Sequence, residues 1–273
     1  NYNVVVGDEA GTAITTGDYN VALGYSAGKA VTTGIKNTLI GGLAGDAITE
    51  ADYNVAIGHN ALTSNVLGSN SVAVGYTTLE SQNPASAVAM YNTAVGHAAG
   101  FAVTTGTNNT LIGGLAGDAI TTGVQNVATG TYALGANTTG GQNVAIGRAA
   151  LESNTTASAN TAVGHHALLS NTTGAENVAV GNNSLLSNTT GNFNTSDGSY
   201  AMKLNTTGSD NAAFGQGSLF YNTTGSYNVA IGRQALFANT TASNNTAVGK
   251  SALAANTTGA SNVGVGSGSL DAN

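Results

Sequence analysis

The chain has 273 residues, of which only 7% are charged and 41% are hydrophobic, and its formal net charge is −7. It contains 39 glycines, one proline, and no cysteine or tryptophan. This composition excludes an intrinsically disordered chain, and the negative charge argues against nucleic acid or an anionic membrane as a partner.

A five-residue motif, Asn-x-Ala-hydrophobic-Gly, recurs along the chain, for example at 54–58, 143–147 and 160–164. The three glycines of these copies are Gly58, Gly147 and Gly164. The motif glycine returns with a 17-residue period, and only the interval from Gly75 to Gly96 is longer. A fixed period of this length indicates a solenoid, in which each repeat buries its apolar face against its neighbours. We therefore predict a single repeat domain of 16 repeats over residues 1–273.

Each repeat is numbered here from its asparagine as position 1. Positions 1 to 5 alternate with period two and are rich in Val and Ile, which predicts a first strand. Positions 7 to 10 contain Ala-Leu, as in Ala167-Leu168, and predict a second short strand. Asn-Thr-Thr-Gly follows, as at 171–174, and is typical of a turn. The predicted fold is all-β: a parallel β-solenoid (β-roll) of 16 coils with a 17-residue repeat and two short strands per coil.

Positions 9 and 12 vary together. Position 9 is Leu or Met in eleven repeats, including Leu151 and Leu168, and Gly in the other five. In those five repeats position 12 changes from its usual Asn to Val or Ile, as in Ile14 and Ile120. Loss of one apolar side chain and gain of another nearby indicates a shared core of conserved volume. We therefore place these four residues in the core.

The first strand has two small or apolar faces. We predict that Val144 and Ile146, at positions 2 and 4, point into the core. Ala145 and Gly147, at positions 3 and 5, would then face outward and need a second surface to pack on. A neighbouring copy of the same chain is the simplest candidate, which predicts a homo-oligomer.

The longer interval places a four-residue insertion within 81–91, around the only proline, Pro84. We predict a loop that protrudes from an otherwise regular surface. Its residues Asn83, Pro84 and Tyr91 are the candidate contact site for a partner.

The strand motif, as in 71–75 (Ser-Val-Ala-Val-Gly), resembles the YadA-like head repeat of trimeric autotransporter adhesins. With its Asn-Thr-Thr-Gly turns, the chain is equally similar to repeats of phage tail-fibre proteins. The resemblance covers essentially the whole chain, although the period is longer than that of the adhesin heads. It implies a left-handed β-roll, a homotrimer and a role in surface attachment.

The histidines give no pattern of metal ligands. Three of them occupy position 6, a tolerant slot that we expect to face solvent: His59, His97 and His165. His165 and His166 are adjacent and should point to opposite faces of an extended chain. A zinc site needs converging ligands, so we predict no metal site.

The acidic residues give no catalytic pattern either. Glu176 and Asp210 share position 17 but lie two coils apart, and Asp197 occupies a normally apolar slot, where a locally distorted coil is the favoured explanation. The glycine-rich segment 41–46, repeated at 113–118, lacks the Lys-Ser/Thr ending of a phosphate loop. The Asn-Thr-Thr triplets fit the glycosylation pattern, but their phase favours turns with stacked amides. We predict no catalytic residue and no cofactor.

These observations favour a structural and adhesive fibre segment, extracellular on a cell surface or a virion, over an enzyme. The expected partners are further copies of the chain and an unidentified receptor or glycan, with no nucleic acid. No run of apolar residues is long enough to cross a bilayer, so we expect no membrane insertion in this segment. No capping element is recognisable at either end, which suggests a part of a longer fibre. The alternative is a single-chain β-solenoid that binds a flat surface such as ice or polysaccharide.

Overall fold

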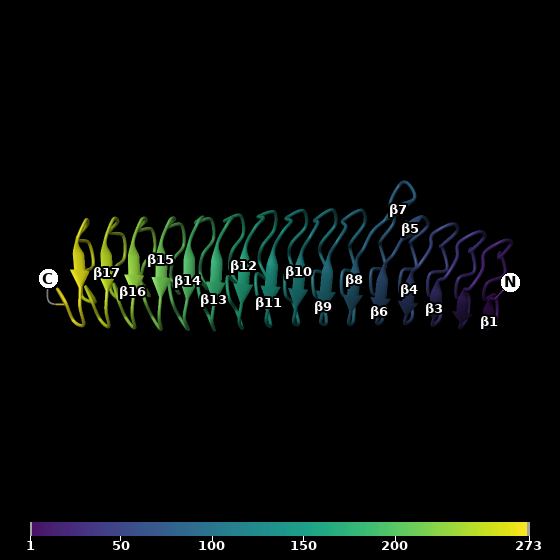
Figure 1. Ribbon diagram of the computed structural model, residues 1–273, viewed down its shortest axis with the longest axis horizontal. Coiled ribbons are helices and arrows are strands. Elements are labelled where there is room, and N and C mark those ends of the chain that lie inside the picture. The colour runs from purple at the N-terminus through teal and green to yellow at the C-terminus, as the bar shows by residue number, and fades with distance from the viewer. Residues whose placement is uncertain (1, 272–273) are drawn as a thin grey trace. The chain divides into compact units, whose positions relative to one another are not determined.

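The computed structural model describes residues 2–271, which are all strand, turn or irregular backbone. A membrane-spanning helix is therefore not found among these residues. The chain separates into two compact units, Asn1–Gly141 (unit 1) and Gln142–Asn273 (unit 2). Each unit is a parallel β-solenoid (Figure 1), and together they comprise about 15 turns with a repeat of ~17 residues.

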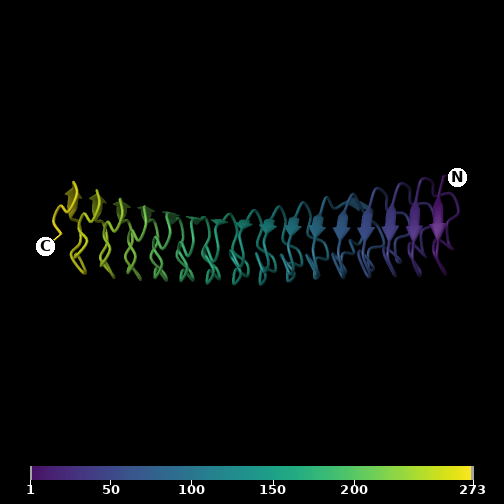
Figure 2. The same ribbon diagram turned by 90° about the horizontal axis from the view of Figure 1, so that it is seen from below.

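Unit 1 has eight three-residue strands in its main sheet, in the order β1-β2-β3-β4-β6-β8-β9-β10. They are β1 (Val4–Val6), β2 (Val21–Leu23), β3 (Thr38–Ile40), β4 (Val55–Ile57), β6 (Val72–Val74), β8 (Thr93–Val95), β9 (Thr110–Ile112) and β10 (Val127–Thr129). All these strands pair in parallel, and their arrows, purple to teal in Figure 2, point the same way. Val72 pairs with Thr93, so the sheet keeps its register across the four-residue insertion.

Unit 2 repeats the arrangement with β11 to β18, in sequence order. These strands are β11 (Val144–Ile146), β12 (Thr161–Val163), β13 (Val178–Val180), β14 (Thr195–Asp197), β15 (Ala212–Phe214), β16 (Val229–Ile231), β17 (Thr246–Val248) and β18 (Val263–Val265). Equivalent residues pair directly, as Ala145 does with Ala162. The parallel solenoid and its 17-residue period, predicted from the sequence, are confirmed.

The prediction of two strands per coil is wrong. The second half of each repeat is a turn in which positions 7 and 9 adopt left-handed backbone angles, for example Ala149 (φ 55°) and Leu151 (φ 52°). A β-strand cannot include such angles. The backbone still bonds from turn to turn, because the Leu151 amide donates to the Ala167 carbonyl at 3.0 Å. Inter-turn hydrogen bonds therefore continue well beyond the three-residue strand.

The core prediction is right for the second half of the repeat and wrong for the strand. Leu151, Leu168 and Ile120 are completely buried, and Ile14, in the first turn, is half-buried. The strand is the other way round from the prediction: Ala145 is buried, Val144 is half-buried and Ile146 is 42% exposed. In turns with a leucine at position 9, such as Leu151, only a small side chain fits at position 3, because that buried leucine occupies the same interior. The Val and Ile side chains consequently point outward.

The exchange between positions 9 and 12 has a direct structural cause. Ile48 is fully buried, and a Cβ added to Gly45 would lie 2.9 Å from its Cδ1 atom. The same Cβ would lie 2.8 Å from Cδ2 of Leu39, which replaces the usual alanine at position 3. Gly117, Ile120 and Leu111 repeat this arrangement. Positions 3, 9 and 12 therefore share one interior volume, filled in two alternative ways.

Two ladders of buried asparagines line the interior. At position 1, Asn160 Nδ2 donates to the Gly174 carbonyl at 2.9 Å, and its Oδ1 accepts from the backbone amide of Asn177 at 3.0 Å. At position 12, Asn171 Nδ2 donates to the same Gly174 carbonyl at 2.8 Å. Buried polar groups need such partners, because an unsatisfied amide costs about 1–3 kcal/mol. The asparagines thus have a structural function in every turn that contains them.

The repeat glycine is required by the close approach of successive turns. Gly147 has φ 136°, a region that favours glycine, and a Cβ added there would lie 2.5 Å from the Gly164 carbonyl oxygen. Gly164 (φ 134°) is equally close to Gly181, and Gly58 (φ 138°) has the same relation to Gly75. Any side chain at position 5 would push neighbouring turns apart.

Candidate contact surfaces

Each unit carries an apolar surface on the outer side of its main sheet, called here the outer face and formed by positions 2 and 4 of the strands. In unit 1 its members include Leu23, 44% exposed, and Ile57, 36% exposed. In unit 2 they include Ile146 and Ile231, each 42% exposed. Aligned side chains from eight parallel strands make each outer face a continuous surface. Large exposed apolar patches on soluble proteins mark contact sites.

Asp197 lies on the outer face of unit 2, at position 4 of β14, and is exposed. It pairs in regular register with Val180 on one side and Phe214 on the other. The sequence-based explanation, a locally distorted coil, is therefore wrong. The buried residues of this turn also differ, because Ser196 at position 3 accepts a hydrogen bond from Ser184 at 2.7 Å between the Oγ atoms.

Positions 6 and 7 form the edge of the solenoid directly after each strand. His165 and His166, predicted to point apart, instead stack with their ring centroids 3.7 Å apart. The reason is the left-handed angle of His166 (φ 57°), which turns its side chain to the same side as that of its neighbour. Arg148 Nη1, one turn earlier, lies 3.2 Å from Nε2 of each imidazole. Burial, followed by the charges of His165 and Arg148, lowers the pKa of His166.

The other two histidines lie on the same edge in unit 1. Tyr76 stands between them, with its ring centroid 5.8 Å from that of His59 and 5.6 Å from that of His97. Both ring pairs are stacked, so the two imidazoles face a phenol and not each other. Within the described residues no group of three or more His, Cys, Asp or Glu side chains lies close enough to hold a metal ion.

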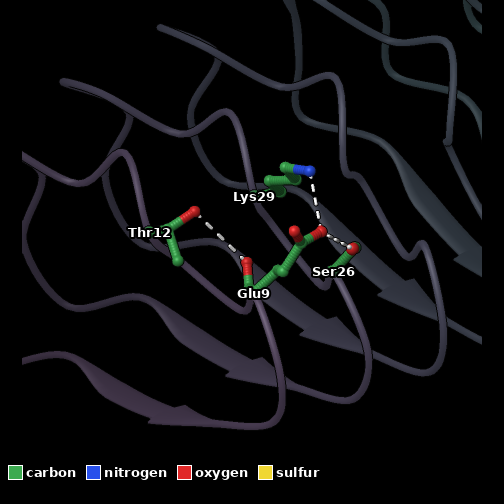
Figure 3. Close-up of polar contacts among 4 residues, drawn as sticks. All are labelled: Glu9, Thr12, Ser26 and Lys29. Carbon is green, nitrogen blue, oxygen red and sulfur yellow. Dashed lines mark hydrogen bonds and ion pairs between the residues drawn. The ribbon is translucent and has the colours of Figure 1, made fainter.

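At the start of unit 1 the same edge is acidic. Glu9 Oε2 accepts hydrogen bonds from Lys29 Nζ at 2.7 Å and from Ser26 Oγ at 3.1 Å, and Thr12 Oγ1 donates to the Glu9 carbonyl (Figure 3). The bond from the Lys29 ammonium group is the largest cause of the lowered pKa of the Glu9 carboxyl. Both side chains are exposed, so this ion pair links successive turns without large stabilisation.

The predicted loop exists and protrudes in unit 1 beside β7 (Val88–Ala89), which pairs with β5 (Gly68–Ser69) in a separate two-stranded sheet (Figure 1). Asn83 and Tyr91 are exposed, as a contact site requires, but Pro84 is buried. Beside the loop lies an open cleft of ≈ 250 Å³. It is lined by Glu50, Asp52, Tyr53, Ser69, Asn70 and 87–89.

Gln82 anchors the base of this loop. It replaces the usual asparagine at position 12 and is fully buried. Its longer side chain donates to Ser71 Oγ at 3.1 Å and accepts from Asn92 Nδ2 at 3.0 Å. Ser71 in turn replaces the usual asparagine at position 1, so the longer glutamine compensates for the shorter serine.

The Asn-Thr-Thr turns have two rows of hydroxyl groups. One row is exposed, and the hydroxyl groups of the other row are hydrogen-bonded to the next turn. At position 13, Thr172 Oγ1 donates to the Thr189 carbonyl at 3.0 Å, and this bond repeats from turn to turn. The position 14 threonines are exposed; in unit 2 they are Thr156, Thr173, Thr190, Thr207, Thr224, Thr241 and Thr258. The Asn171 amide of the glycosylation-like triplet is buried and hydrogen-bonded, which agrees with the turn-and-ladder interpretation.

The remaining acidic candidates are dispersed. Glu176 and Asp210 are exposed at position 17, both in left-handed turns. In the glycine-rich segments, Asp46 accepts a hydrogen bond from Thr63 at 2.5 Å, and burial raises the pKa of Asp118. The segments 41–46 and 113–118 are turns of the solenoid, and no helix follows either of them in the described residues.

No protein-family model matches the chain, and no curated protein matches it.

Proposed function

We propose that this chain is a non-catalytic segment of an extracellular fibre, on a cell surface or a virion, whose copies associate through their outer faces. The resemblance to trimeric adhesin heads and phage tail fibres supports a left-handed β-roll, a homotrimer and a role in attachment. The proposal keeps the homo-oligomer that the sequence suggests but moves the contact from the Ala/Gly side of the strand to the Val/Ile side.

The outer face is the observation that carries this proposal. In unit 1, seven of the eight residues at position 4 are Val, Leu or Ile, and Thr129 is the eighth. Burying apolar surface contributes about 25 cal/mol per Å², so this row, flanked by the Val and Thr residues of position 2, favours association. A chain with only 7% charged residues has few groups that would oppose contact between copies.

The turn-to-turn bonding supports a mechanical role. Successive turns are joined at the strand, as between Val144 N and Asn160 O at 2.8 Å. They are joined again at the threonine turn, as between Thr155 N and Thr172 O at 3.1 Å. Bonds at several points around each turn resist bending and shear within a unit, which is the property that a spacer requires.

The mass of the chain in solution, measured by light scattering after size exclusion, tests the proposal. We expect a mass near three times 26.6 kDa for the natural chain. The double variant Ile146→Lys/Ile231→Lys places charges on the outer face and should shift the mass towards 26.6 kDa while the circular dichroism spectrum is unchanged. Thr173→Lys/Thr224→Lys, with the same charge change on exposed turn residues, is the matched control and should remain oligomeric. A folded natural chain that is monomeric would refute the proposal.

A further inference from the structure

Charge in unit 2 is segregated by repeat position. Position 6 is occupied by Arg148, His165, Asn182, Ser199, Gln216, Arg233, Lys250 and Ser267. Position 7 is occupied by Ala149, His166, Asn183, Tyr200, Gly217, Gln234, Ser251 and Gly268. These sixteen residues, called here the basic edge, include three of the chain's six Lys and Arg residues and no carboxylate. The edge is therefore cationic although the chain as a whole carries a net charge of −7.

The cations of the basic edge are exposed and have no carboxylate partner among the described residues. Arg148, Arg233 and Lys250 are all exposed, and none of them forms an ion pair within residues 2–271. Lys29 in unit 1 differs, because it is paired with Glu9 at 2.7 Å. An exposed cation without a counter-charge is available for an anionic ligand at little desolvation cost.

The first cluster of the edge combines charge with neutral hydrogen-bonding groups. Arg148 lies against both stacked imidazoles, and Asn182 Nδ2 lies 3.3 Å from Nδ1 of His165. Asn183 Nδ2 donates to Asn182 Oδ1 at 2.7 Å. Guanidinium, imidazole and carboxamide groups from three successive turns thus stand side by side on one surface.

The second cluster lies further along unit 2, where Arg233 and Lys250 occupy position 6 of successive turns. The Ser251 amide donates to the Arg233 carbonyl at 2.9 Å, which fixes the two turns relative to each other. Between the clusters the edge presents hydroxyl and amide side chains, namely Ser199, Tyr200 and Gln216. Turns are about 4.8 Å apart, so the edge is a ladder of polar groups with cations near both ends.

This pattern matches one class of polymer. An acidic polysaccharide carries carboxylates separated by rings that are rich in hydroxyl groups, and hydroxyl and amide side chains are suitable partners for those rings. Double-stranded DNA carries one charge per about 1.7 Å and is bound by much denser Lys and Arg clusters. A lipid surface is recognised by large apolar side chains beside the cations, and this edge has only Tyr200 of that kind.

We propose that the basic edge of unit 2 binds an acidic polysaccharide that bears carboxylates. The inference rests on the proposed role in attachment, and it names the ligand class and the surface that holds it. Arg148 and the Arg233–Lys250 pair meet carboxylates of the polymer, and the intervening amides and hydroxyls meet its sugar hydroxyls. Several weak contacts along one chain sum to useful affinity.

The chain supplies its own matched control for the test. Arg233→Gln/Lys250→Gln removes two cations from the basic edge, and Lys29→Gln/Lys36→Gln removes two cations from unit 1. Both double variants change the net charge equally. Binding of the 273-residue chain to polygalacturonate is measured by biolayer interferometry, with neutral dextran as the reference polymer. We expect about a tenfold loss of affinity for the edge variant and less than about a twofold change for the control.

Four results would overturn the inference. They are no binding of polygalacturonate by the natural chain, equal binding of dextran, equal losses in the two double variants, or tighter binding of single-stranded DNA than of polygalacturonate. Light scattering on the same samples separates this inference from the proposed function. If the chain is an oligomer but does not bind the polymer, only the proposed ligand is refuted. If it is a monomer that binds the polymer, only the proposed association through the outer face is refuted.

Discussion

The side-chain amide of Asn188 donates to Oδ1 of Asn171, in the preceding turn, at 2.8 Å. The same Asn171 donates to Asn154 Oδ1 at 3.0 Å, so the amides form a chain along the interior of unit 2. Each asparagine is both donor and acceptor, and each is fully buried. The ladder therefore holds equivalent residues of successive turns in line along the solenoid, from its interior.

The ladder predicts that Asn171→Asp is more destabilising than its size suggests. The new oxygen cannot donate to Gly174 or Asn154, and a buried carboxylate lies beside their carbonyl and amide oxygens. We expect a loss of about 3–5 kcal/mol in the free energy of unfolding near neutral pH, measured by chemical denaturation. The loss should shrink in acid, where a protonated carboxyl can donate one bond. Thr173→Asp, on the exposed row, is the control and should cost little at either pH.

The shared volume of positions 9 and 12 predicts coupling between two substitutions. Leu168→Gly should destabilise unit 2 by about 3–5 kcal/mol, because it leaves a cavity. Adding Asn171→Ile refills that cavity, as Ile48 does beside Gly45, but it also breaks the amide ladder. The loss of stability in the double variant should therefore be about 1–3 kcal/mol smaller than the sum of the losses in the two single variants. Additive losses in a double-mutant cycle of denaturation measurements would show that the two positions do not share the interior.

The left-handed turns predict a stabilising glycine substitution. Ala159 is exposed and has φ 60°, where a Cβ is unfavourable. Ala159→Gly should raise the free energy of unfolding by about 0.5–1 kcal/mol, because the relief of backbone strain exceeds the added flexibility of the unfolded chain. Ala175→Gly, one position earlier in the next repeat, has no such angle and should lower stability instead. The opposite order of the two variants in thermal denaturation would contradict this account of the turns.

The histidine pair predicts a pH dependence of stability. The pKa of His166 is lowered from 6.5 by burial, by His165 and by Arg148, so the folded chain favours the neutral imidazole. Protons then bind the unfolded chain more readily than the folded chain. The stabilisation is present above the ordinary pKa of 6.5 and is lost as the pH falls from there towards the lowered value. His166→Gln should reduce the difference between denaturation midpoints at about pH 7.5 and about pH 5.5, while His97→Gln should leave it in place.

The parts of the fold that could be predicted from sequence are those with a periodic signal. The glycine of position 5 gives the period, and the exchange of Leu for Ile between positions 9 and 12 reveals a shared interior. Alternation in a short strand shows that it has two faces but not which one is inside. Val144 and Ile146 are the larger and more apolar residues, yet the interior accepts only Ala145, because Leu151 and two asparagines already fill it.

The candidate surfaces were harder to predict for a related reason. Left-handed angles at residues other than glycine give no recognisable sequence signal, so the side-by-side placement of His165 and His166 could not be foreseen. The burial of Pro84 also depends on how the inserted loop folds back on unit 1. The segregation of cations at positions 6 and 7 is visible in the sequence once the repeat is aligned, but its meaning depends on knowing that these positions share one edge.

The most direct test of the central claim is a single-cysteine cross-linking experiment, because the natural chain has no cysteine. Ile146→Cys places a thiol on the outer face, and Thr173→Cys places one on the exposed threonine row. Each variant is treated with a short bis-maleimide and examined by denaturing electrophoresis. If copies associate through their outer faces, Ile146→Cys gives covalently linked chains and Thr173→Cys stays at 26.6 kDa. Linked chains from Thr173→Cys and none from Ile146→Cys would contradict the account.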